Sequence, residues 1–237
     1  MMIARFPGLV LALVASTALV EAPQSLRGVP GLPDVLPEGW YARLDTERGA
    51  IAIRLLPDQA PQSVAHFAAL AEGRMSWIDP YTGNEATGHY YDGVVVHKAV
   101  AGHRFEAGDR TGTGRGAPPY FVPPEGFAPV NFDGPWRMGM TRFTAGRLSA
   151  VVFFVTAGSE PWLNGKHPCF GEVVGGKDVV MEITAVSTLS DDTPREPIVI
   201  ERVRVHAVGD PPPLPEPVRY TPPPREPLRP KPQPVQP

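Results

Sequence analysis

Short runs of alternating apolar and polar residues dominate the chain from about Trp40 to Val208, and this pattern constrains the fold most. The first two runs meet at Glu47-Arg48-Gly49, which is typical of a hairpin turn. Later runs are DGVVVHKAV, AVVFFVTAG, CFGEVVGG and PIVIERVRVHAV. The runs do not alternate with helices in βαβ order, so they predict a mainly β fold, an antiparallel barrel or sandwich.

Two segments break the strand pattern. In APQSVAHFAALAEGR, apolar residues recur at helical spacing, Pro61 stands in the first turn, and Gly73 follows the last turn. A second, shorter helix is expected around Asp178 to Ile183. The sequence therefore predicts two helices that cap the β structure.

The N-terminus is typical of a secretory signal peptide. Arg5 precedes an uncharged run from Phe6 to Val20, with small residues near its end. An uncleaved anchor is the alternative, although the run is shorter than the roughly 20 apolar residues of a membrane span. We expect a periplasmic or secreted protein with a signal peptide over residues 1–22, no membrane span after cleavage, and a linker over residues 23–38.

Proline is concentrated at the other end, where thirteen of the 31 prolines lie between Pro211 and Pro237. Such a segment cannot build a core and favours extended polyproline II. Residues 209–237 are therefore predicted to be a disordered, proline-rich tail. A spacer is the simpler interpretation, and a docking tail for a partner is the alternative. Deleting Pro211 to Pro237 is expected to leave the melting temperature nearly unchanged.

Charge and cysteine content exclude several classes of function. The formal net charge of -3 and a pI near 6.1 argue against nucleic-acid binding. Cys169 is the only cysteine, so no intrachain disulfide can form, and it is most simply a core residue. A zinc site built from His89, His97 and His103 lacks the usual pair spacing. We therefore predict neither a cofactor nor a metal.

The segment GDRTGTGRGAPPYFVPPEG, from Gly108 to Gly126, contains a glycine pattern like that of a phosphate-binding loop. Such a loop needs a helix to begin directly after it, and Pro118 and Pro119 prevent this. The glycines are better explained by a tight loop that requires positive φ angles.

Three segments carry a family resemblance: GAIAIRLLPDQAPQSVAHFAALAEG, YYDGVVVHKAVAGHRFEAGDRTGTGRG and PWLNGKHPCFGEVVGG. In this order and spacing they resemble the cyclophilin family of peptidyl-prolyl cis-trans isomerases. The likeness covers Trp40 to Val208 and includes WIDPYTG, an insertion typical of bacterial members. It implies a domain over residues 39–208: an eight-stranded antiparallel β-barrel closed by two α-helices, with an extended peptide bound on its outer face.

The resemblance also implies a catalytic group. Rotation about an X-Pro bond is slow because the planar amide loses its resonance at the top of the barrier. A donor aimed at the twisted prolyl nitrogen stabilises only that state. Cyclophilins use an arginine in a Phe-His-Arg-Val motif, and this chain has Val96-His97-Lys98-Ala99. Lys98 is therefore the expected donor, although it lacks the planar fork of arginine.

The peptide-binding residues are carried over in the same way, with departures. The family's Gly-Phe-Met-x-Gln-Gly-Gly-Asp becomes Gly102 to Asp109, so that charged residues replace part of the proline pocket. Arg104 and Glu106 share a strand face, and we expect them to pair with each other or with Lys98. The implied substrate-binding set is His103, Arg104, Glu106, Met140, Phe154, Trp162, Leu163 and His167.

Two functions remain open from the sequence. The first is an extracytoplasmic folding catalyst that isomerises X-Pro bonds in extended peptides with weakened activity. The second is a catalytically silent cyclophilin-like module that binds peptides or a partner. In either case we expect a monomer whose partners are proline-containing polypeptide segments.

Overall fold

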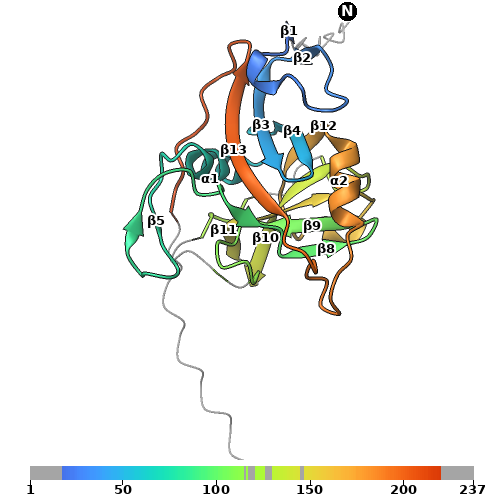
Figure 1. Ribbon diagram of the computed structural model, residues 1–237. Helices are drawn as coiled ribbons and strands as arrows, with labels where there is room; N and C mark the ends of the chain where they lie inside the picture. The colour runs from blue at the N-terminus through green and yellow to red at the C-terminus, as the bar shows by residue number, and fades with distance from the viewer. Residues whose placement is uncertain (1–17, 115, 117–120, 126–129, 145–146, 220–237) are drawn as a thin grey trace, which may run out of the picture.

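The computed structural model describes residues 18–114, 116, 121–125, 130–144 and 147–219 of the chain (Figure 1). Its main sheet contains β3 (Gly39–Thr46), β4 (Gly49–Leu55), β7 (Val94–Val95), β8 (Lys98–Val100), β9 (Arg104–Ala107), β10 (Arg137–Thr144), β11 (Arg147–Thr156), β12 (Cys169–Gly175) and β13 (Val199–Val208). The strands are antiparallel and lie in the order β7-β13-β3-β4-β12-β10-β11-β9-β8. The sheet curls, and the predicted mainly β fold is confirmed.

The sheet has nine strands rather than eight because one strand is interrupted. Only Val96 and His97 separate β7 from β8. The Val96 amide donates to the Ile198 carbonyl (2.9 Å), and the His97 amide donates to the Glu106 carbonyl (3.0 Å). The segment from β7 to β8 therefore bonds to both ends of the sheet, and counting it as one strand gives the expected eight.

Both predicted helices are present, as α1 (Pro61–Ala71) and α2 (Lys177–Thr184). Helix α1 presents Phe67 to the centre of the core, where its ring lies 5.0 Å from Tyr91, 5.7 Å from Phe153 and 5.5 Å from Phe170. These tilted and edge-on contacts are the favourable geometries for aromatic pairs. The predicted hairpin also forms, because β3 and β4 pair directly from Tyr41 opposite Arg54 to Thr46 opposite Gly49.

Helix α1 depends on a distant residue for its N-terminal cap. Ala60, at the capping position, has no side chain that could accept a hydrogen bond. The Glu125 carboxylate replaces it by accepting hydrogen bonds from the amides of Gln62 and Ser63 and from the Ser63 hydroxyl. A carboxylate is favourable at this end of a helix because unpaired amides and the helix dipole both point toward it.

The glycine-rich loop surrounds a carboxylate of the protein itself. Asp109 is 2% exposed and accepts hydrogen bonds from the amides of Thr111 (2.8 Å), Thr113 (3.2 Å) and Gly116 (2.9 Å). Burial alone raises the pKa of Asp109, but the bonds from Thr111 and Gly116 outweigh it and hold that pKa below its usual value. The amides that would hold a phosphate thus hold Asp109.

Glycine is required in this loop for two reasons. Gly112 and Gly114 have φ angles of +67° and +71°, as the sequence interpretation expected. At Gly116, an added Cβ would lie 2.0 Å from a carboxylate oxygen of Asp109. The loop therefore closes around Asp109 only because no side chain stands between them.

Residues 23–38 differ from the predicted linker. The strands β1 (Leu19–Glu21) and β2 (Val35–Pro37) pair with each other, and a short 3-10 helix, η1 (Gln24–Leu26), lies between them. Leu26 and Leu36 are buried against Tyr41 and Val208 of the main sheet. The segment is an apolar extension of the barrel, because its buried leucines pack against the main sheet as well as against each other.

Residues 211–219 of the predicted tail, which we call the strap, contact the domain. The Trp40 indole donates to the Pro212 carbonyl (2.8 Å), and Gln62 accepts from the Val218 amide (2.8 Å) and donates to the Glu216 carbonyl (3.3 Å). A ring nitrogen of His66 lies 2.9 Å from the Val218 carbonyl. Figure 1 shows this segment running from the end of β13 past α1.

The strap is held mainly through its backbone, which an extended proline-rich chain leaves free for hydrogen bonding. It also packs Leu214 against the core, and the Arg219 guanidinium donates to the Ser76 carbonyl (2.7 Å). The expectation that deleting Pro211 to Pro237 leaves the melting temperature unchanged is therefore not supported. Residues 220–237 of the predicted tail, and residues 1–17 of the predicted signal peptide, lie outside the described residues.

Three short elements complete the structure: β5 (Trp77–Ile78), β6 (Glu85–Ala86) and the 3-10 helix η2 (Pro161–Leu163). The strands β5 and β6 pair in a small hairpin, in which β5 and the turn belong to the predicted WIDPYTG insertion and β6 follows it. In the part of the chain that the structure describes, no helix is both long and apolar enough to span a bilayer.

Candidate active site

Strand pairing brings the predicted site residues to one face of the sheet. Lys98 on β8 lies opposite Glu106 on β9, and Glu106 lies opposite Phe154 on β11. Directly opposed residues point to the same face, as do residues two apart on one strand, so Arg104 joins them. Phe153, one position before Phe154, points the other way into the core. Side-chain alternation alone thus places four predicted residues together.

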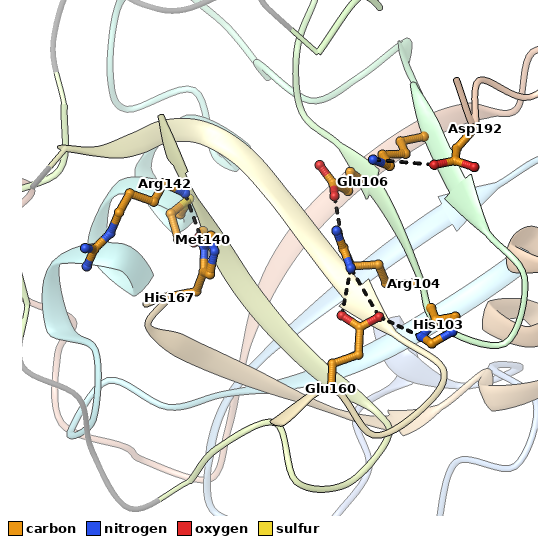
Figure 2. A network of polar contacts seen from close by, with 9 residues as sticks. His103, Arg104, Glu106, Met140, Arg142, Glu160, His167 and Asp192 are labelled. Carbon is orange, nitrogen blue, oxygen red and sulfur yellow. Dashed lines mark hydrogen bonds and ion pairs between the residues drawn. The ribbon is translucent and has the colours of Figure 1, made fainter. Parts of the chain in front are cut away.

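Arg104 lies at the centre of a network of charges on this face (Figure 2). Its Nε donates to Glu106 (2.9 Å), and its Nη1 donates to both carboxylate oxygens of Glu160 (3.2 and 2.9 Å). His103 Nδ1 lies 3.3 Å from Glu160. The predicted pairing of Arg104 with Glu106 is therefore present, and a second carboxylate holds the same guanidinium.

Glu160 is the residue of this network that sequence reasoning missed. Its side chain is 0% exposed, so its charge needs a partner, and Arg104 provides one. Its backbone amide donates to the Phe132 carbonyl (2.8 Å). Burial alone lowers the pKa of Arg104, but Glu106 and Glu160 raise it above its usual value, so the guanidinium stays charged. A single glutamate before Pro-Trp carries no local signal of this role.

Lys98 points away from this network. Its Nζ lies 3.6 Å from the Asp192 carboxylate, and the two side chains are 35% and 45% exposed. Asp192 belongs to the loop between α2 and β13, and its carbonyl also accepts a hydrogen bond from the Ala99 amide (2.9 Å). The predicted donor therefore has a competing partner, although exposed ion pairs of this kind are weak.

Apolar residues of the predicted pocket gather around the ring of Phe154. The ring centroid lies 5.3 Å from that of Phe132 and 5.4 Å from that of His167. Phe132, Phe154, Leu163 and Cys169 form one buried cluster, separate from the main core. The structure thus adds Phe132 to the predicted set and confirms that Cys169 is buried, where burial raises its thiol pKa to about 12.

The rim of this cluster is aromatic and exposed. Trp162 is 49% exposed, and its ring centroid lies 5.8 Å from that of His103, whose side chain is 46% exposed. Phe154 is only 2% exposed and Leu163 only 7%. A peptide approaching this face would therefore meet Trp162 and His103 before it reached the buried rings.

Met140 does not contribute its side chain to the predicted site. That side chain is 0% exposed and belongs to the main core, so only the backbone at this position contacts a site residue. His167 Nδ1 lies 3.1 Å from the Met140 carbonyl and 3.3 Å from the Arg142 amide. Burial lowers the pKa of His167, so its ring is neutral at pH 7, and Nδ1 serves one of these two neighbours at a time.

Comparisons with known proteins match most of this chain. A family model described as "Cyclophilin type peptidyl-prolyl cis-trans isomerase/CLD" matches residues 41–205. Peptidyl-prolyl cis-trans isomerase B of Streptomyces anulatus is 41% identical over 171 residues, which are 71% of this chain and 97% of that protein. Peptidyl-prolyl cis-trans isomerase A of Mycobacterium tuberculosis is 37% identical over 166 residues, covering 69% and 91%.

Solved structures agree on the fold. A crystal structure of a Cryptosporidium parvum cyclophilin type peptidyl-prolyl cis-trans isomerase superposes with a TM-score of 0.61 and 24% identity. The superposition covers 71% of this chain and 98% of the Cryptosporidium parvum chain. A structure of the same protein in the presence of the dipeptide Ala-Pro superposes with a TM-score of 0.59.

Proposed function

Since the chain belongs to the cyclophilin-type peptidyl-prolyl cis-trans isomerase family, we propose that it isomerises X-Pro bonds in extended, proline-containing segments outside the cytoplasm. Peptidyl-prolyl isomerase activity is the activity its relatives are named for. The related structure with Ala-Pro supports proline-containing peptides as substrates. A folding catalyst for exported proteins is the role that combines these features.

The observation that carries the proposal is the position of the Phe154 cluster beside charged donors on one sheet face. Phe154, Leu163 and Phe132 form a buried apolar cluster that a proline ring can enter once the groups that cover it move. Arg104 and Lys98 lie on the same face and offer N–H groups for the twisted prolyl nitrogen. Holding the ring fixes the reacting bond, and a donor that meets only the twisted nitrogen lowers the barrier without a covalent step.

We propose further that the activity is weakened. Phe154 is covered by Phe132, by His167 and by the Arg104 guanidinium, whose central carbon lies 5.9 Å from the ring centroid. A proline ring can reach Phe154 only if some of these groups move. Glu106 and Glu160 hold Arg104 in place, so the proline ring must displace Phe132 or His167 from Phe154, and the loss of that packing weakens productive binding.

A catalytically silent, peptide-binding module is the second candidate. The direction of Lys98 favours it, because a lysine paired with Asp192 is not aimed at a bound peptide. The exposed pair of Trp162 and His103 could still bind a peptide without turnover. The two functions differ in one measurable quantity, which is the rate of isomerisation.

We expect the protein to accelerate cis-trans exchange of short X-Pro peptides, measured by exchange NMR without a coupled protease. Leu163→Ala should lower kcat/KM by roughly tenfold, since a pocket contact of this size is worth about 1–3 kcal/mol. Leu19→Ala is the matched control, because Leu19 is 70% exposed on β1. Peptide-induced shifts at Trp162 without any acceleration would support the silent module instead.

The extracytoplasmic location is proposed from the N-terminal sequence, and the position of β1 suggests where the signal peptide ends. Cleavage after Ala18 would follow Ser16-Thr17-Ala18, which has small residues at the third and the first position before the cleaved bond. The strand β1 begins at Leu19 and would stay whole. Cleavage after Ala22 would remove β1, together with the Ala22 amide that donates to the Asp34 carbonyl (2.8 Å).

We therefore expect the exported protein to begin at Leu19. Intact-mass measurement on protein recovered from the periplasm or the medium tests this directly. Ala18→Arg should block processing, because a large charged residue does not fit the cleavage position. A mass that matches a mature chain beginning at Pro23 would contradict the proposed site. A full-length mass recovered from membranes would support the uncleaved anchor.

A further inference from the structure

We propose that Arg104, and not Lys98, donates the hydrogen bond that stabilises the twisted prolyl nitrogen. The inference rests on the isomerase function proposed above and assigns its central group. Arg104 stands at a position that the family resemblance gives to a wall of the proline pocket, and Lys98 stands at the position of the family's donor. The structure favours the exchange of roles for three reasons.

The first reason is the distance to the apolar surface. The central carbon of the Arg104 guanidinium lies 5.9 Å from the centroid of the Phe154 ring. The Lys98 ammonium is instead paired with Asp192, at the outer edge of β8. A proline ring held near Phe154 would therefore have the guanidinium beside it, and the ammonium on the far side of Glu106.

The second reason is that the guanidinium is already oriented. Glu106 binds Nε, and Glu160 binds Nη1 through both of its oxygens. A planar guanidinium held at Nε and Nη1 cannot rotate, so the direction of its third nitrogen, Nη2, is fixed. A donor fixed before the reaction needs no reorganisation in the transition state, which is the condition for strong electrostatic stabilisation.

The third reason is that the remaining guanidinium nitrogen, Nη2, is available. Among the described residues, Nη2 of Arg104 makes no hydrogen bond and no ion pair. The side chain is 20% exposed, so part of it reaches the solvent. Glu160 then acts as a positioning residue, because it contacts Arg104 and not the peptide.

An obstructing role for Arg104 predicts the opposite effect of mutation. If the guanidinium only covers Phe154, then Arg104→Met should restore an apolar wall and increase the rate. If it donates, the same substitution should remove the transition-state contact and decrease the rate. The sign of the change therefore decides between the two roles.

The experiment compares Arg104→Met with Lys98→Met by exchange NMR on a panel of X-Pro peptides. We expect Arg104→Met to lower kcat on the order of 100-fold, as for removal of a single preorganised donor. Peptide affinity, measured by chemical-shift titration, should change little, because the contact forms only in the transition state. Lys98→Met is the comparison variant, and we expect it to lower kcat by much less than Arg104→Met does.

Arg104→Lys provides a second measurement that does not depend on losing the charge at this site. Lysine can still pair with Glu160 but lacks the fork, so we expect roughly a tenfold loss of kcat. Loss of activity in Lys98→Met with normal activity in Arg104→Met would overturn the assignment, and so would a faster Arg104→Met. A wild-type protein without any acceleration would instead overturn the isomerase function itself.

Discussion

Asp109→Asn is expected to lower the free energy of unfolding by about 3 kcal/mol, because it places an amide where a buried charged acceptor is needed. The Asp109 carboxylate accepts bonds from the amides of Thr111, Thr113 and Gly116 and from the Thr111 hydroxyl. Asparagine keeps the shape but replaces one acceptor oxygen with an NH2 donor. Urea unfolding measures the loss.

Asp79→Asn is the matched control. Asp79 makes the same kind of turn, accepting from the amides of Tyr81 and Thr82, but in an exposed loop. Water can replace those bonds, so we expect a much smaller loss of stability. Similar losses in the two variants would mean that burial of Asp109 adds nothing to its bonds.

The effect of Asp109→Asn should also depend on pH. Hydrogen bonds hold the pKa of Asp109 below its usual 3.8 in the folded protein, despite burial. The stabilisation from a depressed carboxyl pKa is present above the unfolded value and is lost as the pH falls through the folded value. The difference between wild type and variant should therefore shrink below about pH 3.8.

Removal of the strap is expected to lower the melting temperature by roughly 6 to 12 °C. The comparison is between a chain that ends at Arg219 and one that ends at Asp210. The second loses the hydrogen bonds to Trp40, Gln62 and His66 and the packing of Leu214. Together these contribute about 3 kcal/mol net, and each kcal/mol shifts the melting temperature of a domain this size by about 2–4 °C.

A double-mutant cycle separates the strap contacts from general effects of shortening the chain. Gln62→Ala should destabilise the chain that ends at Arg219, because it removes two bonds to the strap backbone. The same substitution should have little effect in the chain that ends at Asp210. Equal effects in both chains would show that Gln62 acts elsewhere, and that the strap does not dock in solution.

The sequence predicted most of the barrel because its strands and helices have local signals. Alternation around the Glu47–Gly49 turn, the helical spacing after Pro61 and the glycines near Asp109 are all readable within about ten residues. The same alternation placed Arg104 and Glu106 on one face. Each of these features depends only on residues that are close to it in the sequence.

The features that the sequence did not predict are contacts between distant segments. Composition shows that residues 211–219 cannot form a core of their own, but not that Gln62 and His66 bind their backbone. Nor does any local pattern pair Glu160 with Arg104, or turn Lys98 toward Asp192. Site chemistry here is decided by tertiary neighbours, which is why the donor assigned from motif position differs from the one the geometry supports.

The strap also determines how the domain would respond to mechanical force on its C-terminus. Tension applied at the C-terminus would first load the contact of Arg219 with Ser76. It would then load the contact of Val218 with His66, and last that of Pro212 with Trp40. These contacts would break one after another, as in peeling, before any tension reached β13, which is paired with β3 along its length. The proline-rich segment would thus dissipate load and shield the barrel from shear.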